Sequence, residues 1–359
     1  MKANKGEWSE FYALLKILED RRLFVADKDL NIIADKFFVF QKIIRNEINE
    51  ETKIFDLQES EILILDKENR LLKTIQNDEI KGKTIAIFEQ IKNDSTTTFA
   101  IPEAQNLMHK LLCKQIKASN SKKSDIDAII YDRISNKKEL LGFSIKSMIG
   151  GASTLLNAGK TTNLIYRIDE LSEDLIKSIN NISDKSKIQN RLKIIVENGG
   201  KLKFTKVLNS KFEKNLRKID TVFPIFLSLM LLDFFMGKAN KITDLVNLLV
   251  NNEELRNLYR LSRSDYEYKV KNLLVSIALG MIPSKEWDGF TKAHGGYIVV
   301  KQNGDVVCYH LYNRDEFVSY LYENTRFESA SSARHDYGEI YIEEHKMYIN
   351  LNVQIRFTK

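Results

Sequence analysis

The chain has 359 residues, of which 43% are hydrophobic and 29% are charged, and its formal net charge is +6. This composition predicts a globular protein with one large or two modest domains, and the mild basic excess is compatible with a polyanionic partner. The longest apolar run, residues 222–236, is interrupted by Pro224 and Asp233. We therefore expect no membrane-spanning segment and no membrane partner.

Cysteine and histidine spacing indicates neither a disulfide scaffold nor a zinc site. Cys113 and Cys308 are far apart, and the five histidines form no HExxH pattern. The first residues, Met-Lys-Ala-Asn-Lys-Gly-Glu-Trp, lack the apolar core of a signal peptide. The expected location is the cytoplasm.

The N-terminal segment predicts an amphipathic helix over residues 5–19. Its apolar residues recur at helical spacing: Trp8, Phe11, Leu14, Leu15 and Leu18. Glu7 and Glu10 share a face near the helix start. They can simply favour the helix dipole, or one of them can face a metal ion.

A β-rich stretch, two helices and a polar, basic linker are expected next, over residues 23–72, 84–91, 102–116 and 117–124. The β-rich stretch carries β-branched and aromatic residues in short runs. Pro102 suits the first position of the second helix.

Residues 124–147 predict a β-hairpin with a polar turn at residues 136–138. One face of its first strand carries Asp125, Asp127, Ile129 and Tyr131. In the second strand, Ser144 and Lys146 share a face. A carboxylate of the first strand and Lys146 can therefore converge on one point.

That convergence has the chemistry of metal-dependent phosphodiester cleavage. A carboxylate can hold Mg²⁺, and a lysine beside it can position or activate a water molecule. An ordinary amphipathic hairpin with solvated charges is the other interpretation, and the residues alone leave both open.

The segment after Lys146 is rich in Gly, Ser, Thr and Asn, whose hydrogen-bond donors suit phosphate oxygens. The candidate DNA contacts are Ser147, Gly150, Gly151, Thr154, Asn157, Thr162 and Asn163. Gly159-Lys160-Thr161 resembles the end of a P-loop, but Thr154 stands where the first glycine is required. Nucleotide triphosphate binding is therefore rejected, and a plain connecting loop remains the alternative.

Apolar residues three to four positions apart predict helices over 175–182, 187–197, 210–218, 225–236, 242–250 and 266–279. Beyond residue 285 the pattern predicts strands at 296–301, 306–311, 339–343 and 347–357, and a helix at 315–323. Asn303-Gly304 marks the turn between the first two of these strands. In the polar loop 328–338, Arg334 and His335 could contact base edges or phosphates, or could be ordinary loop residues.

Together these segments resemble the HpaII family of type II restriction endonucleases over essentially the whole chain. The residues that carry the resemblance are Asn4-Lys5-Gly6-Glu7-Trp8-Ser9-Glu10, Gly142-Phe143-Ser144-Ile145-Lys146-Ser147, Gly150-Gly151, Thr154-Leu155-Leu156-Asn157, Thr162-Asn163, His294-Gly295-Gly296-Tyr297, Cys308-Tyr309-His310, Tyr312-Asn313-Arg314, Ser332-Ala333-Arg334-His335 and Gln354-Ile355-Arg356-Phe357.

The resemblance implies a nuclease of the PD-(D/E)xK group and assigns roles to four residues. Asp127 matches the first acidic residue of that group, which binds the metal ion, and Lys146 matches its lysine. Ser144 stands where a second acid is expected and could hydrogen-bond to water or phosphate. Lys5-Gly6-x-x-x-Glu10 resembles the helix start of resolvase-like nucleases, which implies that Glu10 supplies the missing carboxylate, with Glu7 as the other candidate.

We therefore expect an α/β (α+β) protein with a restriction-endonuclease-like mixed sheet, a helical insertion and a C-terminal α+β portion. The expected regions are a nuclease core with the catalytic hairpin (residues 1–168), a helical region (residues 169–285) and a C-terminal DNA-recognition region (residues 286–359).

The predicted function is Mg²⁺-dependent cleavage of double-stranded DNA. The resemblance implies a short palindromic target, with 5′-CCGG as the leading candidate, and 5′-phosphate products. The alternatives are a structure-specific, junction-resolvase-like nuclease and a DNA-binding protein whose nuclease site has decayed. A cognate DNA methyltransferase is the expected functional partner, and a palindromic target suggests a homodimer on DNA.

Overall fold

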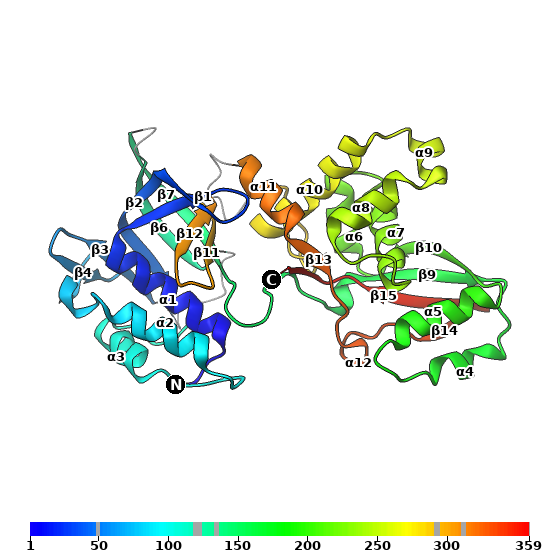
Figure 1. Ribbon diagram of the computed structural model, residues 1–359, viewed down its shortest axis with the longest axis horizontal. Helices are drawn as coiled ribbons and strands as arrows, with labels where there is room; N and C mark the ends of the chain where they lie inside the picture. Colours follow the sequence, from blue (N-terminus) through cyan, green and yellow to red (C-terminus); the bar gives the residue numbers. More distant parts are fainter. Residues whose placement is uncertain (48–50, 118–123, 133–135, 291–294, 310–313, 359) are drawn as a thin grey trace. The chain divides into compact units, whose positions relative to one another are not determined.

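A nine-stranded mixed sheet and helix α1 (Lys5–Asp20) form the centre of the first of two compact units, which comprises residues 1–153 and 291–320 (Figure 1). The second unit comprises residues 154–290 and 321–358. The computed structural model describes residues 1–47, 51–117, 124–132, 136–290, 295–309 and 314–358.

The sheet of the first unit has the strand order β1-β12-β11-β7-β6-β2-β3-β4-β5. Its strands are β1 (Arg22–Ala26), β2 (Ile32–Asn46), β3 (Thr52–Leu57), β4 (Glu61–Leu65), β5 (Leu71–Gln76), β6 (Ile126–Asp132), β7 (Lys137–Ser147), β11 (Gly296–Val300) and β12 (Val306–Tyr309). The pairs β1–β12 and β11–β7 are parallel, whereas the other pairs are antiparallel. Because β1 also pairs with β2, the six strands from β1 to β2 form a closed ring of pairings.

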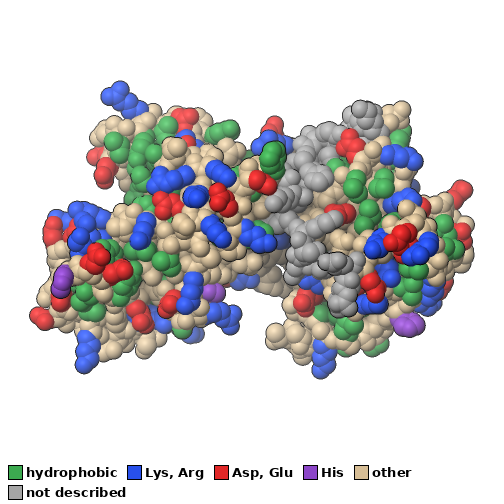
Figure 2. All heavy atoms as spheres, turned by 180° about the vertical axis from the view of Figure 1, so that it is seen from behind, with side chains coloured by type: hydrophobic (Ala, Val, Ile, Leu, Met, Phe, Trp, Pro, Cys, Tyr) green, Lys and Arg blue, Asp and Glu red, His purple; other side chains and the backbone are tan. Residues whose placement is uncertain are grey.

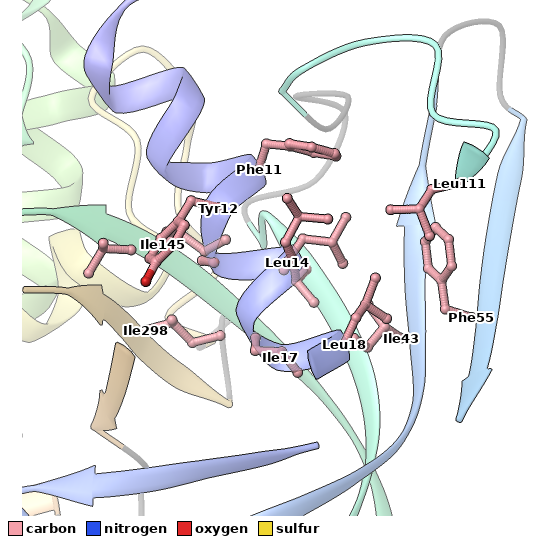
Figure 3. Packing of buried hydrophobic residues seen from close by; sticks show 14 of the residues in the cluster. Phe11, Tyr12, Leu14, Ile17, Leu18, Ile43, Phe55, Leu111, Ile145 and Ile298 are labelled. Carbon is pink, nitrogen blue, oxygen red and sulfur yellow. The ribbon is translucent and has the colours of Figure 1, made fainter. Parts of the chain in front are cut away.

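Helix α1 begins at a capping box and ends where the backbone turns left-handed. The Asn4 side chain accepts a hydrogen bond from the amide of Glu7, whose carboxylate accepts one from the amide of Asn4, each at 3.0 Å. The helix stops because Arg21 has φ 57°. Its apolar side chains are buried against the sheet, where Figure 3 shows Leu18 beside Ile43 of β2, and Phe55 of β3 beside Leu111. This packing fixes one face of α1 on the sheet.

Two further helices of the first unit follow the strands, as predicted. They are α2 (Lys83–Asn93) and α3 (Pro102–Lys110), and Pro102 occupies the first turn of α3. Helix α3 is shorter than the predicted range 102–116, because Leu112 has φ 56°, outside the helical region. Of the predicted linker, residues 118–123 lie outside the described residues.

The second unit has two small sheets with helices packed around them (Figure 1). A four-stranded sheet has the order β10-β9-β15-β14, with β9 (Asn163–Asp169), β10 (Lys201–Val207), β14 (Ile340–Glu343) and β15 (Lys346–Asn352). A three-stranded sheet has the order β13-β16-β8, with β8 (Thr154–Leu156), β13 (Thr325–Phe327) and β16 (Ile355–Phe357). The helices are α4 (Leu175–Asn180), α5 (Lys187–Glu197), α6 (Ser210–Ile219), α7 (Phe223–Phe235), α8 (Ile242–Val250), α9 (Glu253–Tyr259), α10 (Arg263–Leu279) and α12 (Ser332–His335).

Strand β10 lies in the region 169–285 that was predicted to be helical. Its sequence, Lys-Leu-Lys-Phe-Thr-Lys-Val, alternates polar and apolar residues, which is a strand pattern. Gly199, with φ 83°, ends the preceding helix and turns the chain into the strand. The prediction was wrong here because the helical pattern on both sides was extended across a short strand.

The expected C-terminal region is shared between the two units. Strands β11 and β12 pair around the predicted Asn303-Gly304 turn, with Gly304 at φ 91°, and belong to the first unit. Strands β13 to β16 belong to the second unit, and α11 (Arg314–Glu323) contains the boundary. The predicted strand end at residues 310–311 lies outside the described residues. The predicted loop 328–338 contains the short helix α12.

The described part of the chain has no helix that is both long enough and apolar enough to cross a bilayer. On the face shown in Figure 2, Lys and Arg side chains are interspersed with Asp and Glu side chains. The strands and helices described above combine α and β elements around a mixed sheet, as expected.

Candidate active site

Strand β7 places Ser144 and Lys146 on the same face, and the residue before β6 completes this end of the hairpin. Ile126 pairs with Phe143, so Asp125 lies beside Ser144. The Ser144 hydroxyl donates to Asp125 Oδ2 at 3.0 Å, and the Ile145 amide donates to the same oxygen at 2.7 Å. These two bonds fix the Asp125 carboxylate against β7.

Helix α1 brings Glu10 to the same place. Burial, and then repulsion from Asp125, raise the pKa of Glu10 to about 7, while Lys117 and Lys146 act in the opposite direction. Lys117 Nζ lies 3.5 Å from Glu10 Oε1. Glu10 Oε2 is buried and has no hydrogen-bond partner among the described residues. Glu10 therefore has a carboxylate oxygen available for a cation.

Lys146 is half-buried, and its ammonium lies 5.6 Å from the centre of the Tyr297 ring of β11. Burial lowers the pKa of Lys146, whereas attraction to Asp125 and Glu10 raises it. The net direction is downward, which favours proton exchange with a neighbouring water molecule. Glu10, Asp125, Ser144 and Lys146 thus form one cluster in the first unit.

The structure separates the two glutamates that the sequence left as alternatives. Glu7 belongs to the capping box at the start of α1. Glu10 lies one turn further along and interacts electrostatically with Asp125 and Lys146. Glu10 is therefore the glutamate that faces the hairpin cluster.

Asp127, the aspartate predicted to bind metal, lies two residues further along β6, opposite Gly142. It accepts a hydrogen bond from the Ser124 hydroxyl at 2.6 Å. The carboxylate that contacts Ser144 and interacts with Lys146 and Glu10 is Asp125. Sequence alternation placed both aspartates on one face but could not show which is level with Ser144.

The hairpin register has a local cause. The turn was predicted at residues 136–138, but Lys137 and Lys138 are already in β7, where they pair with Asp132 and Tyr131. Asn136, with φ 55°, is the last residue of the connection. Residues 133–135 lie outside the described residues. The predicted turn therefore lies a few residues C-terminal to the connection in the structure.

Three predicted DNA contacts are buried and use their side chains within the protein. Ser147 donates to the Ser9 hydroxyl at 2.8 Å, and Thr162 donates to the Gly159 carbonyl at 3.0 Å. Asn163 donates to the His335 carbonyl at 2.9 Å. This corrects the expectation that they face phosphate, because local sequence shows their polarity but not their burial.

The other predicted DNA contacts are at least partly accessible. Gly150, Gly151 and Asn157 are exposed, and Thr154 is half-buried. Arg334 is exposed on α12, and the neighbouring His335 is half-buried. Gly150 and Gly151 lie in the first unit, which contains the cluster, and the other four residues lie in the second unit.

The cluster suits a hard divalent cation with few protein ligands. Within the ranges that the structure describes, no three His, Cys, Asp or Glu side chains gather closely enough to enclose a metal ion. Mg²⁺ needs only one or two carboxylates, because water and substrate phosphate complete its shell. The buried, partnerless Glu10 oxygen and the neighbouring Asp125 meet this requirement.

Comparisons with known proteins agree with this chemistry. The family model described as HpaII restriction endonuclease matches residues 4–357. The Type II restriction enzyme HpaII of Haemophilus parainfluenzae is 40% identical over 355 residues, which cover 99% of this chain and 98% of the relative. No solved structure matches the chain.

The protein is a type II restriction endonuclease, an enzyme that cleaves DNA at specific sites. The chain belongs to the HpaII restriction endonuclease family. Type II restriction endonucleases generally use a divalent metal ion, and the substrate is DNA. The class of function predicted from the sequence is thereby confirmed.

The raised pKa of Glu10 predicts a stability cost that neutralisation removes. The ordinary pKa is 4.5 and the folded-state pKa about 7, so the folded protein loses stability as the pH rises between these values. In the absence of metal at pH 8, the free energy of unfolding of Glu10→Gln, measured by urea denaturation, should therefore exceed that of wild type by on the order of 3 kcal/mol. The difference should vanish near pH 4.5.

Glu7→Gln is the matched control, because Glu7 lies on the same helix but serves the cap. It should show no comparable gain at pH 8. If Glu10→Gln were no more stable than wild type at pH 8, the Glu10 carboxylate would not be strained by its surroundings.

Proposed function

We propose that the enzyme hydrolyses one phosphodiester bond in each strand of a short palindrome, with Mg²⁺ held by Asp125 and Glu10. The observation that carries this proposal is the meeting of both carboxylates with Lys146 on one end of the β6–β7 hairpin. Asp125 replaces Asp127 in the metal-binding role first predicted. The arrangement supports a restriction-endonuclease-like core, although the ring of pairings around it goes beyond that expectation.

When bound, Mg²⁺ would supply positive charge to the phosphate and to the attacking water. The chain's own residues do the positioning. Ser144 and the Ile145 amide hold Asp125 in one orientation. Lys146, restrained over Tyr297, orients the water and can accept or donate a proton because burial lowers its pKa.

The proposed target is 5′-CCGG with 5′-phosphate products, which is what the family resemblance implies. A palindrome has two-fold symmetry, so a homodimer would present two equivalent sites to it. A cognate methyltransferase is proposed as the functional partner that protects host DNA. We also propose a cytoplasmic location, where the buried free thiols of Cys113 and Cys308 would stay reduced.

Sequence recognition is proposed for accessible side chains of the second unit. Arg334 is exposed, and an arginine can bind guanine O6 and N7 together. His335, Thr154 and Asn157 are further proposed contacts, as are Gly150 and Gly151 in the first unit. Ser147, Thr162 and Asn163 are proposed to shape the loop rather than contact DNA.

The reaction itself is tested with two plasmids that differ only in the presence of 5′-CCGG. The purified enzyme and Mg²⁺ should give discrete bands from the plasmid that contains the site, and a chelator should abolish them. Discrete bands from both plasmids would refute the proposed target, and smearing of both would refute site specificity.

The metal-ligand assignment is tested by a matched pair of neighbouring aspartates. Asp125→Asn should lower the cleavage rate by roughly 10²-fold or more, because it removes a metal ligand, and should leave specific DNA binding measurable. Asp127→Asn should retain most of the activity. Single-turnover cleavage and binding assays decide the matter, and an inactive Asp127→Asn with an active Asp125→Asn would restore the original assignment.

Arg334→Ala tests base recognition. Specific binding should weaken by about 1–3 kcal/mol, while non-specific binding changes much less. The measurement is a titration against target and scrambled duplexes at several salt concentrations. Equal losses on both duplexes, with a salt dependence lower by about one unit, would instead assign Arg334 to a phosphate contact.

A further inference from the structure

A second lysine, Lys117, reaches the hairpin cluster from a different part of the chain. It lies beyond α3, and its ammonium is 3.5 Å from Glu10 Oε1. Its side chain is 39% exposed, whereas that of Glu10 is 16% exposed. Lys117 also acts electrostatically on Lys146. The cluster therefore contains two carboxylates, Glu10 and Asp125, and two lysines. Lys146 belongs to the hairpin, whereas Lys117 comes from the segment after α3.

The segment before Lys117 is anchored by a buried ion pair. Arg45 Nε of β2 donates to Glu47 Oε1 at 2.7 Å, and the two side chains are only 2% and 0% exposed. Arg45 Nη2 donates to the carbonyls of Gln115 and Ile116 at 2.7 and 2.9 Å. Glu47 Oε2 accepts a hydrogen bond from the backbone amide of Lys114 at 3.0 Å. The backbone of the three residues before Lys117 is thus held by hydrogen bonds to the Arg45–Glu47 pair.

Stabilisation of the fold does not by itself account for the buried Arg45–Glu47 pair. A buried ion pair is often no more stabilising than apolar residues of the same size, because both charges must lose their water. Here the pair uses its remaining hydrogen-bonding capacity on the backbone of residues 114–116. Its structural effect is to fix the position from which Lys117 extends toward Glu10.

The two lysines differ in their surroundings. Lys146 is enclosed against the Tyr297 ring, whereas Lys117 is the more accessible and is tied to the cluster through Glu10. A divalent cation on Glu10 and Asp125 would neutralise the charge that attracts Lys117. The Lys117 ammonium would then be available to the negative phosphate that arrives with DNA.

We propose that Lys117 is a catalytic residue that contacts a non-bridging oxygen of the scissile phosphate, and that Arg45 and Glu47 are its positioning residues. The proposal rests on the proposed metal-dependent cleavage at Glu10 and Asp125. In it, Lys146 serves the attacking water and Lys117 stabilises the charge that grows on the phosphate in the transition state. No bond to Lys117 forms or breaks.

Lys117→Ala tests the contact, and Lys114→Ala is its matched control. Lys114 lies in the same segment and forms an ion pair with Glu51 at 2.6 Å, with its side chain 56% exposed. The single-turnover rate of Lys117→Ala at saturating Mg²⁺ should fall roughly 10²-fold, the size expected for one lost charge-stabilising group. Specific binding measured with Ca²⁺ in place of Mg²⁺ should change by less than about threefold, because the contact acts mainly in the transition state.

Lys117→Arg should restore part of the rate, because it keeps the charge near the phosphate. Lys114→Ala should cleave like wild type. A wild-type rate for Lys117→Ala would overturn the proposal. So would equal losses for Lys114→Ala and Lys117→Ala, because the effect would then belong to the segment and not to the contact.

Paired replacement tests the anchor without leaving a buried unpaired charge. The double variant Arg45→Met/Glu47→Met should remain folded, as judged by circular dichroism and thermal melting. Its cleavage rate should fall by the same order as that of Lys117→Ala, and adding Lys117→Ala should cause little further loss. Additive losses would overturn the positioning role, and the Lys117 variants test the contact whether or not the double variant folds.

The wild-type enzyme separates this inference from the proposed function. If wild type does not cleave with Mg²⁺, the proposed function fails. If wild type cleaves and Asp125→Asn does not, but Lys117→Ala cleaves normally, only the Lys117 inference fails.

Discussion

The burial of one carboxylate beside another is the constraint on which this site depends. Glu10 and Asp125 come from different elements and lie near each other where water is partly excluded. Burial and the like charge both favour the protonated form of Glu10. A folded protein would gain by separating these groups or replacing one of them. A cation that binds to both would remove the repulsion, which is why the strained arrangement suits a metal site.

The rest of the first unit maintains that arrangement. The capping box and the buried face of α1 hold Glu10 against the sheet. Two hydrogen bonds from β7 hold Asp125, and the Tyr297 ring restrains Lys146. The buried pair Arg45–Glu47 fixes the segment that carries Lys117. Helix α1, strand β7 and the segment before Lys117 thus each position part of the cluster.

Local pattern predicted the elements of the site but not its register. The alternation in β6 and β7 and the helical spacing of α1 were sufficient to predict the hairpin faces and to name Glu7 and Glu10 as candidates. The preference for Glu10 came from the family resemblance. The choice between Asp125 and Asp127 depended on where the hairpin turns, because residues two apart share a face. Lys117, Arg45 and Glu47 meet only through tertiary packing, so no spacing in the sequence indicated them. The burial of Thr162 and Asn163 is likewise a property of the folded loop.

The central claim is that Asp125 and Glu10 together hold the catalytic metal ion. The most direct test is a crystal structure of the enzyme with its DNA target and Mn²⁺, in which anomalous scattering locates the metal. The account predicts a peak about 2.0–2.2 Å from a carboxylate oxygen of both residues, next to the scissile phosphate. A peak coordinated by Asp127, or by neither Glu10 nor Asp125, would contradict it.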